Sequence, residues 1–408
     1  MTRAAKVAEF LGLRRSIVGL LMMVILVDLG ERMAERFLPI YLMALGGGAI
    51  SIGLLNGLDN LLSALYSFPG GYLSDRLGAK RALLIFNLIA ITGYLIVVIV
   101  PVWQAVIAGA VLFVSWSAIS FPATMSVVAR SLPQNKRTMG VSMHSLVRRI
   151  PMALGPLLGG AFIAAWGEID GVRIAFMVST AMALIAIILQ QRLIEDDRGR
   201  GQGAAGESAI QKTPLKLFRN MSPELKKLLI SDILIRFCEQ IPYAFVVVWC
   251  MKTVAAPVSS IQFGILTSIE MATAVVVYLP VAYVADRARK GPFVNITFVF
   301  FSLFPVALLF SRSFWPLVGA FVVRGLKEFG EPARKALIMD LAPEEEKAAM
   351  FGLYYLIRDA IVSLAAFGGA FLWQISPTTN LLIAFSFGVI GSLWFALTVR
   401  GDHGMTSA

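Results

Sequence analysis

Long apolar segments recur along the whole chain, separated by short loops that contain charged residues, glycine or proline. A helix needs about 20 consecutive apolar residues to cross a membrane, and most of these segments reach or exceed that length. Only 15% of the 408 residues are charged and 58% are hydrophobic, whereas soluble domains carry about 25% charged residues. The pattern predicts an all-α integral membrane protein with twelve transmembrane helices, at residues 16–45, 50–76, 81–100, 103–131, 138–166, 172–193, 225–252, 259–287, 292–312, 314–342, 347–374 and 378–400.

The loops between these segments differ in positive charge. Lysine and arginine gather before the first segment and after each even-numbered segment, whereas the alternate loops hold little beyond Arg173, Lys252 and Arg312. By the positive-inside rule, both termini and the central loop are expected to be cytoplasmic. The sequence therefore predicts a multi-pass protein of the cell (inner) membrane, surrounded by lipids and monomeric.

The net charge of +11 fits this orientation better than it fits nucleic-acid binding. A nucleic-acid-binding face combines basic residues with interleaved aromatic residues, and the sequence contains no such face. We therefore expect no nucleic-acid partner.

A polar, glycine-rich stretch interrupts the apolar pattern between Glu195 and Glu224. Glycine-rich composition is typical of a flexible linker. It predicts an N-terminal six-helix bundle at residues 1–193, a cytoplasmic linker at 194–224 and a C-terminal six-helix bundle at 225–408.

The two halves share several sequence elements in nearly the same register. These are an Asp-x3-Arg-x2-Glu triplet, a Tyr-x2-Asp-Arg sequence, a Pro-Ala pair, a later proline, an arginine and a Gly-Gly-Ala-Phe sequence. They begin at residues 28, 72, 122, 133, 148 and 159 in the first half, and at 232, 283, 332, 343, 358 and 368 in the second. Parallel repeats of this kind are typical of transporters that hold their substrate between two halves near the membrane midplane.

The loop after the second segment resembles a motif of the major facilitator superfamily. Residues 71–81 read Gly-Tyr-Leu-Ser-Asp-Arg-Leu-Gly-Ala-Lys-Arg, similar to the family's G-x-L-x-D-R-x-G-R-K-x, with Ala79 in place of the first basic residue. The resemblance implies two six-helix bundles related by a pseudo-twofold axis. It also implies a conformational gate on the cytoplasmic side, formed by Gly71, Asp75, Arg76, Gly78 and the second-half residues Asp286 and Arg287.

A second resemblance concerns the direction of transport. Gly155-Pro156-Leu-Leu-Gly159-Gly160 is similar to the core of the family's antiporter motif, although Ser142 and Pro151 replace its upstream glycines. A packing face made of glycine and proline would have the same composition. The motifs are most similar to those of drug/proton antiporters, which implies a proton-coupled secondary active transporter that exports a small organic solute by alternating access.

Two alternatives remain open. Glu31-x3-Glu35-Arg36-Phe37 resembles the E-x-x-E-R-F signature of proton-coupled peptide transporters, with one residue too many. This resemblance favours peptide transport, and the many arginines inside the apolar segments favour a proton symporter for an anionic or zwitterionic metabolite or a peptide. The other alternative is a membrane receptor or lipid-handling protein that has the same fold but does not transport a solute.

Ionisable residues inside apolar segments are costly unless they pair or face water, so they predict the functional site. Burial raises the pKa of a carboxyl group and a neighbouring guanidinium lowers it, so a carboxylate under both influences can exchange a proton. Arginine is permanently charged and binds carboxylate or phosphate in a forked geometry. The predicted proton-coupling residues are Glu35, Glu239, Glu270 and Glu328, and the predicted substrate-binding residues are Glu31, Arg32, Arg36, Arg148, Arg236, Arg324 and Arg358.

The alternative for each of these charges is a purely structural ion pair. The triplets predict that Arg32 and Glu35 face Arg236 and Glu239, whereas Glu31 and Arg36 lack charged counterparts and are expected to make the site specific. His144 is either a proton relay, because histidine titrates near neutral pH, or a core residue.

The sequence gives no support for metal binding, ATP-driven transport or enzymatic catalysis. Two histidines and two cysteines offer no metal-ligand spacing, and no Walker-type phosphate loop is present. We expect no metal, no cofactor and no enzymatic activity; the expected partners are a small-molecule substrate and protons.

Overall fold

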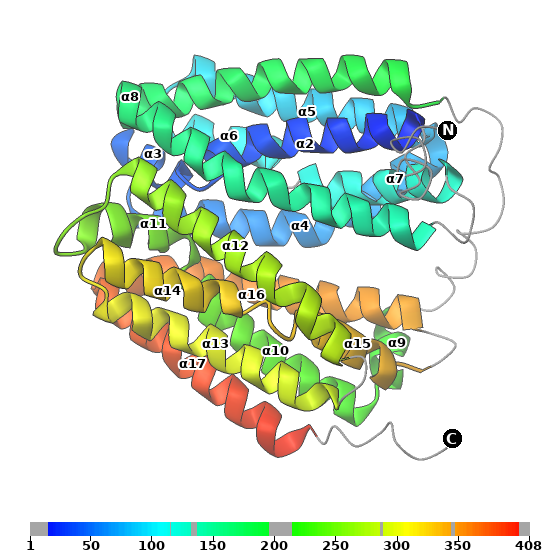
Figure 1. Cartoon of the computed structure of the whole chain (residues 1–408), viewed down its shortest axis with the longest axis vertical. Helices are drawn as coiled ribbons and strands as arrows, with labels where there is room; N and C mark the ends of the chain where they lie inside the picture. Colours follow the sequence, from blue (N-terminus) through cyan, green and yellow to red (C-terminus); the bar gives the residue numbers. More distant parts are fainter. Residues whose placement is uncertain are drawn as a thin grey trace. The chain divides into compact units, whose positions relative to one another are not determined.

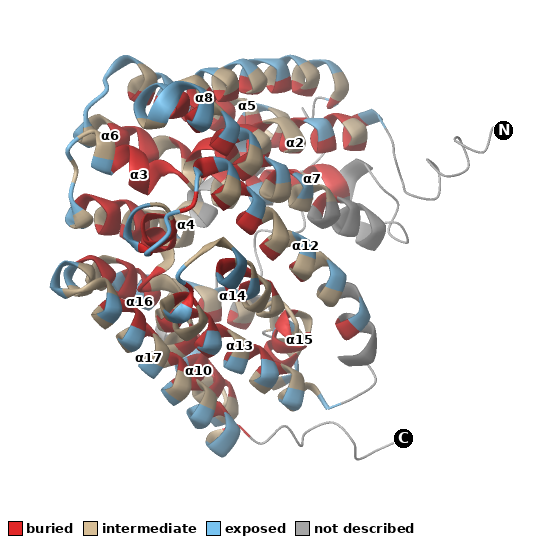
Figure 2. Cartoon of the chain, turned by 60° about the vertical axis from the view of Figure 1, so that its left-hand side comes forward, coloured by how far each residue is buried: buried red, intermediate tan, exposed pale blue. Residues whose placement is uncertain are grey.

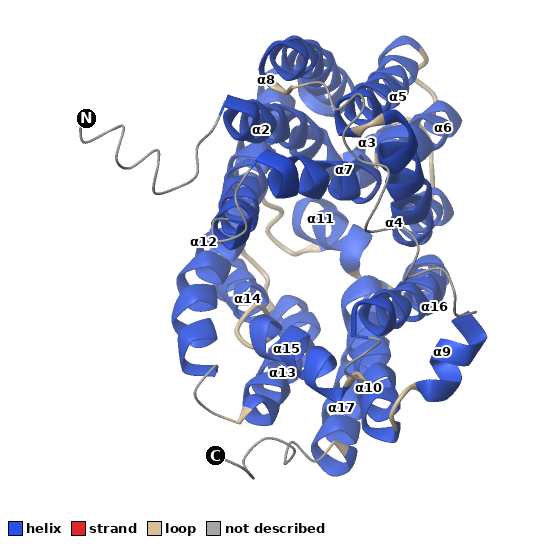
Figure 3. Cartoon of the chain, turned by 90° about the vertical axis from the view of Figure 1, so that its right-hand side faces the viewer, coloured by secondary structure: helices blue, strands red, loops and turns tan. Residues whose placement is uncertain are grey.

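The computed structural model describes residues 15–114, 116–131, 137–195, 214–285, 289–343 and 347–399. Within these ranges all regular structure is helical and no strand is present (Figure 3). The chain divides into two compact units. The first comprises residues 1–51, 62–202 and 259–268, and the second comprises residues 52–61, 203–258 and 269–408. The predicted linker at 194–224 stays a prediction, since residues 196–213 lie outside the described ranges.

Unit 1 is built around the contact between its first and last helices. Figure 1 shows α2 running alongside α8, and these two helices make the most extensive contact in the unit. Helix α5 packs against α6, α7 and α8. The helices of this part of the chain are α2 (Arg15–Glu35), α3 (Leu38–Ala44), α4 (Ala49–Leu77), α5 (Ala79–Ile99), α6 (Trp103–Phe113), α7 (Trp116–Ser131) and α8 (Arg137–Leu193).

Single glycines make two of the tight turns in unit 1. Gly78 separates α4 from α5 with a φ of 84°, a conformation that only glycine adopts without strain. Gly167 has a φ of 81° inside α8 and divides that helix into two arms. The fifth and sixth predicted segments therefore follow one another almost without a loop.

Unit 2 has its own helical core. Helix α10 packs against α13, α16 and α17, and Ser222 caps its start by accepting a hydrogen bond from the Leu225 backbone N–H. The elements of this part of the chain are α9 (Pro214–Asn220), α10 (Pro223–Gln240), η2 (Tyr243–Phe245), α11 (Val246–Val248), η3 (Trp249–Thr253), α12 (Ser260–Ala285), α13 (Lys290–Phe310), α14 (Phe314–Leu326), α15 (Glu331–Leu341), α16 (Lys347–Ile375) and α17 (Pro377–Thr398).

Many helices expose large apolar side chains, and charged side chains are buried between helices. In Figure 2, α17 and α13 each carry exposed residues along one side, and Leu397 and Trp315 are 80% and 77% exposed. Such a surface suits lipid rather than water. Among the described residues, eight stretches are long and apolar enough to cross a membrane: 79–99, 103–128, 147–193, 223–253, 260–277, 290–310, 350–375 and 377–398.

Each of the twelve predicted segments coincides with one helix, one arm of α8 or a run of shorter helices. The all-α fold is therefore confirmed. The structure adds breaks that the hydropathy pattern did not predict: the helix stops at residues 36–37, 241–242 and 327–330. Each break lies within a few residues of buried charges, and breaks in membrane helices are tolerated where neighbouring helices satisfy the released backbone groups.

Candidate transport site

Each unit contains a cluster of buried charged residues. In unit 1 the centre is Asp28 on α2, which is fully buried. Arg148 on α8 donates from Nε to Asp28 Oδ2 at 2.8 Å, and from Nη2 to Ser117 Oγ at 2.7 Å. At the end of α2, Arg32 pairs with Glu35 one turn further on. The charged stretch that interrupts the first apolar segment is thus held by ion pairs.

Two glycines of α8 allow that helix to approach the charged stretch. A Cβ at Gly155 would collide with the Cβ of Arg32, and one at Gly159 would overlap the carbonyl oxygen of Met33. Both glycines belong to the sequence that resembles the antiporter motif. Their role in this structure is to bring α8 close to α2, so that Arg148 reaches Asp28.

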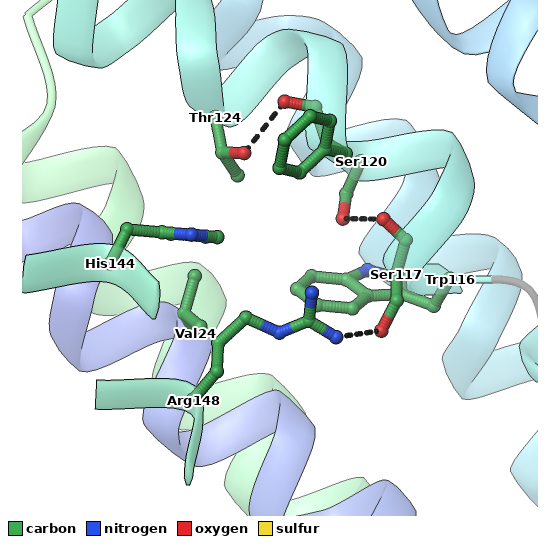
Figure 4. Close-up of a pocket in the computed structure, with 8 residues that line it drawn as sticks. Val24, Trp116, Ser117, Ser120, Thr124, His144 and Arg148 are labelled. Carbon is green, nitrogen blue, oxygen red and sulfur yellow. Dashed lines mark hydrogen bonds between the residues drawn. The ribbon is translucent and has the colours of Figure 1, made fainter. Parts of the chain in front are cut away.

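The space beside Asp28 and Arg148 is narrow and polar. Figure 4 shows His144 and Arg148 directed into it from α8, with Trp116, Ser117, Ser120 and Thr124 opposite on α7; Val24 and Phe121 complete the lining. The space is too narrow for a solute molecule. It could admit a proton but not a substrate.

Glu239, at the end of α10, lies between two cations in unit 2. Its Oε2 accepts a hydrogen bond from Arg236 Nη1 at 2.6 Å, and its Oε1 accepts one from Lys327 Nζ at 2.7 Å. The side chains of Glu239 and Lys327 are 10% and 12% exposed. Lys327 follows the last turn of α14, where that helix breaks, so the break places the ammonium group opposite the end of α10.

A second carboxylate lies on the other side of Lys327. Glu270 of α12 is buried, and its Oε1 lies 3.6 Å from Lys327 Nζ and 3.3 Å from Arg324 Nε. Lys327 therefore stands between Glu239 and Glu270. Small shifts of its flexible side chain would change which carboxylate it neutralises.

Asp232 is the centre of a further group of contacts in unit 2. It accepts hydrogen bonds from Arg334 of α15 and, on Oδ2, from Tyr354 at 3.1 Å and Arg358 at 3.4 Å, both on α16. Arg334 also binds Glu331 in a forked geometry, with nitrogen–oxygen distances of 2.9 and 2.6 Å. This geometry is the strongest form of charge-assisted hydrogen bonding.

Arg236 joins the two groups into one network. Besides binding Glu239, its guanidinium lies 3.7 Å from Glu331 and 3.9 Å from Asp232. The network places charges of both signs in alternation, so that no charge in it is buried alone. Its acids are Asp232, Glu239, Glu270, Glu331 and Asp359, and its bases are Arg236, Arg324, Lys327, Arg334 and Arg358.

Aromatic rings accompany the cations of this network. Arg324 lies over the rings of Tyr243 and Phe304 at 5.5 and 5.0 Å, and Arg236 and Lys327 lie over Phe301 at 5.2 and 5.8 Å. Glu239, Arg324 and Lys327 line a small pocket together with Phe300, Phe301 and Phe304 of α13. The pocket therefore combines flat aromatic faces with one carboxylate and two cations.

The structure brings most of the predicted site residues into these clusters. Glu35, Glu239 and Glu270 are each ion-paired, and Glu328 lies half-buried in the break between α14 and α15. Glu31 is buried on α2, and its Oε2 makes no hydrogen bond to the described residues. Arg36 lies half-buried in the break after α2. The predicted substrate contacts Arg148, Arg236, Arg324 and Arg358 are all paired with carboxylates of their own unit.

The predicted gate is described only in part. Arg76 is exposed and donates to the hydroxyl group of Tyr72 at 3.0 Å, and Gly78 makes the tight turn that its sequence position predicts. The surroundings of Gly71, the side chain of Asp75 and the residues Asp286 and Arg287 lie outside the described part of the structure. The gate stays a prediction.

The prediction of the site omitted several residues that hold it together. Asp28 and Asp232 accept the hydrogen bonds of Arg148 and Arg358, Lys327 links two carboxylates, and Tyr354 binds Asp232. The repeat contained a signal for the first two, because each aspartate and its arginine recur at matching positions in both halves. No sequence signal marks Tyr354.

Long apolar helices that expose large apolar side chains define a multi-pass membrane protein. The family model of the Major Facilitator Superfamily matches residues 20–256 and 228–406, so the chain belongs to that superfamily and is a secondary transporter of its type. An uncharacterised MFS-type transporter of Methanocaldococcus jannaschii is 21% identical over 378 residues, which cover 90% of each chain. The methyl viologen resistance protein SmvA of Salmonella typhimurium is 26% identical over 165 residues, 40% of this chain and 32% of that protein.

Solved structures of transporters share the fold. The nucleoside transporter NupG superposes with a TM-score of 0.80 and 14% identity, over 94% of this chain and all of that one. A peptide transporter of the POT family gives a TM-score of 0.76 with 13% identity, over 95% of this chain and 94% of its own. A bacterial homologue of the lysosomal transporter Spinster gives 0.72 with 14% identity, over 93% and 97%.

Proposed function

We propose that the protein is a proton-coupled antiporter that exports a small organic solute, most readily an organic cation, by alternating access. The observation that carries the proposal is Glu239, a buried carboxylate held between Arg236 and Lys327 in a pocket with aromatic faces.

The proposed coupling step is the protonation of Glu239. A proton on this carboxyl group removes the charge that holds Lys327 at 2.7 Å, while Glu270 stands 3.6 Å away on the other side of the ammonium. Lys327 then turns toward Glu270, and the contacts between α10 and α14 change with it. Proton binding favours one arrangement of the network over another, which is what coupling to an ion gradient requires.

The aromatic faces favour a cationic solute. Phe301 and Phe304 already lie beneath Lys327 and Arg324, so their faces accept positive charge. The arginines that an anionic substrate would bind are paired with carboxylates, for example Arg324 with Glu270 and Arg358 with Asp232. These pairings support the exporter over the symporter of an anionic metabolite. A relative named for methyl viologen resistance is consistent with export of an organic cation.

The experiment is a proton-flux measurement in inside-out membrane vesicles that contain a pH-sensitive dye. A proton gradient is established, and a panel of organic solutes that includes methyl viologen is added. We expect at least one solute to release protons from vesicles that contain the protein. Glu239→Gln, which removes the titrating group and keeps its shape, is expected to abolish that release.

Asp170→Asn is the matched control, because it also removes one carboxylate, from an exposed pair with Arg173 outside both clusters. Its flux should equal that of the unaltered protein. Solute binding without proton movement, or full flux in Glu239→Gln, would contradict the proposed coupling.

A further inference from the structure

The two halves repeat one ion pair in three dimensions. Asp28 of α2 binds Arg148 of α8 in unit 1, and Asp232 of α10 binds Arg358 of α16 in unit 2. The aspartates begin the repeated triplets, and the arginines stand at equal distances after the paired prolines. Each unit can therefore serve as a reference for the other.

The aspartate of unit 2 binds a second cation in addition to the arginine of the repeated pair. Besides Arg358, Asp232 binds Arg334, the residue that follows Pro332-Ala333. In the first half, the residue that follows Pro122-Ala123 is Thr124. Thr124 carries no charge and donates its hydroxyl hydrogen to the carbonyl oxygen of Phe121 at 2.7 Å. Thr124 therefore does not supply Asp28 with the second cation that Arg334 supplies to Asp232.

A titratable residue in unit 1 occupies a position where unit 2 has a tyrosine. Four residues before Arg358 is Tyr354, whose hydroxyl group binds Asp232 at 3.1 Å. Four residues before Arg148 is His144. Because residues four apart lie on one face of a helix, His144 is directed to the same side of α8 as Arg148, as Figure 4 shows.

The surroundings of His144 leave its ring nitrogens open to a proton. The side chain is only 3% exposed, and its nitrogens make no hydrogen bond to the residues that the structure describes. The charged groups that act on the ring are Arg148 on its own helix and Asp28 on α2. Glu31 is a second buried acid on α2 near that pair. From α7, the groups that face the ring are the hydroxyls of Ser117, Ser120 and Thr124 and the ring of Phe121.

We propose that His144 is a proton-binding residue of unit 1, and that its imidazolium form competes with Arg148 for Asp28. The proton enters as H⁺, no bond other than N–H is formed, and the charge of the cluster rises by one. Protonation thus supplies the second cation that Arg334 supplies permanently in unit 2. Arg148 is then free to leave Asp28 and to bind a partner elsewhere.

The proposed role of this proton in transport rests on the proposed function. Proton binding itself is a property of the residues around His144. A second titrating group in unit 1, separate from Glu239 in unit 2, would allow one proton-sensitive contact in each half.

The test uses the fact that the chain has only two histidines. His403→Gln leaves His144 as the single histidine in the full-length protein, so ring-labelled histidine gives one NMR signal. We expect that signal to change with pH within the range from about pH 4 to 9, as the imidazole ring gains its proton. Asp28→Asn removes the attracting carboxylate and should lower the titration midpoint by about one pH unit, whereas Arg148→Gln removes the competing cation and should raise it by a similar amount.

A signal that does not change between pH 4 and 9 would overturn the proposal. So would a midpoint that is the same with and without the Asp28 carboxylate. Glu31→Gln is the matched control, since it removes the other buried acid of α2; a midpoint that follows Glu31 and ignores Asp28 also contradicts the proposal. These outcomes do not depend on proton flux in vesicles, so failure of the proposed function and failure of this inference are distinguishable.

Discussion

Lys327 lies between two buried carboxylates, and this position determines what its substitution does. Lys327→Met removes one cationic partner from both Glu239 and Glu270, which keep Arg236 and Arg324 respectively. Removal of one member of a buried ion pair typically costs about 3–5 kcal/mol, because the remaining charge stays in a poorly solvating environment. We expect the variant to unfold at a clearly lower temperature in detergent.

A second substitution distinguishes electrostatics from packing at the same site. Glu270→Gln in the Lys327→Met background removes the charge that has lost part of its compensation, so we expect it to restore much of the lost thermal stability. The measurement is a double-mutant cycle of unfolding temperatures. Strictly additive effects would show that Lys327 contributes through its methylene chain alone.

At the residue scale, the sequence predicts which charges are buried better than it predicts their partners. The Asp–Arg pairs could be anticipated from the repeat, because both members recur at matching positions. The position of Lys327 between Glu239 and Glu270 could not be anticipated from the sequence, because it depends on how α14 is rotated against α10 and α12. A rotation of one residue, 100°, would direct the ammonium elsewhere.

At the scale of helices, the glycines of α8 determine how closely α8 approaches α2. Gly159→Ala places a methyl group against the carbonyl oxygen of Met33, so α8 must move away from α2. Overpacking of this kind typically costs about 1–3 kcal/mol. We expect a lower unfolding temperature and a weakened Arg148–Asp28 contact.

The repeat provides the control. Gly368 begins the Gly-Gly-Ala-Phe sequence of the second half, as Gly159 does in the first, yet a Cβ at Gly368 meets no atom within 4 Å. Gly368→Ala should therefore leave the unfolding temperature unchanged or slightly raised, since alanine favours a helix more than glycine does. Equal destabilisation by both substitutions would contradict the close-packing role of Gly159.

Hydropathy predicted where the helices lie but not where they break. The first apolar segment appears in the sequence as one span, whereas the structure ends α2 at Glu35 and begins α3 at Leu38. Apolar content does not report backbone continuity, because a break costs little where side chains and neighbouring helices satisfy the released backbone groups. A proline lies within each break or two residues after it, at Pro39, Pro242 and Pro332, and these prolines were the available signal.

For the whole molecule, the distribution of lysine and arginine predicts the orientation in the membrane. Both native cysteines are buried, so cysteines introduced at the surface can be labelled selectively. We expect Ala255→Cys, exposed in the loop between η3 and α12, to react with a membrane-impermeant maleimide in intact cells. Arg289→Cys, exposed before α13, should react only after the cells are permeabilised. The reverse labelling pattern would invert the predicted topology.

The pair Glu331–Arg334 in unit 2 and its uncharged equivalents in unit 1, Phe121 and Thr124, bear on how a duplicated chain can diverge. A change at only one of the two positions would unbalance the buried charges, because Arg334 would keep Asp232 but lose Glu331, or Glu331 would keep Arg236 but lose Arg334, and such a sequence would fold less stably. After a duplication, one copy can therefore gain or lose this ion pair only when its acid and its base change together. At a buried site of this kind, we expect the two residues of an ion pair to be substituted together and not one at a time.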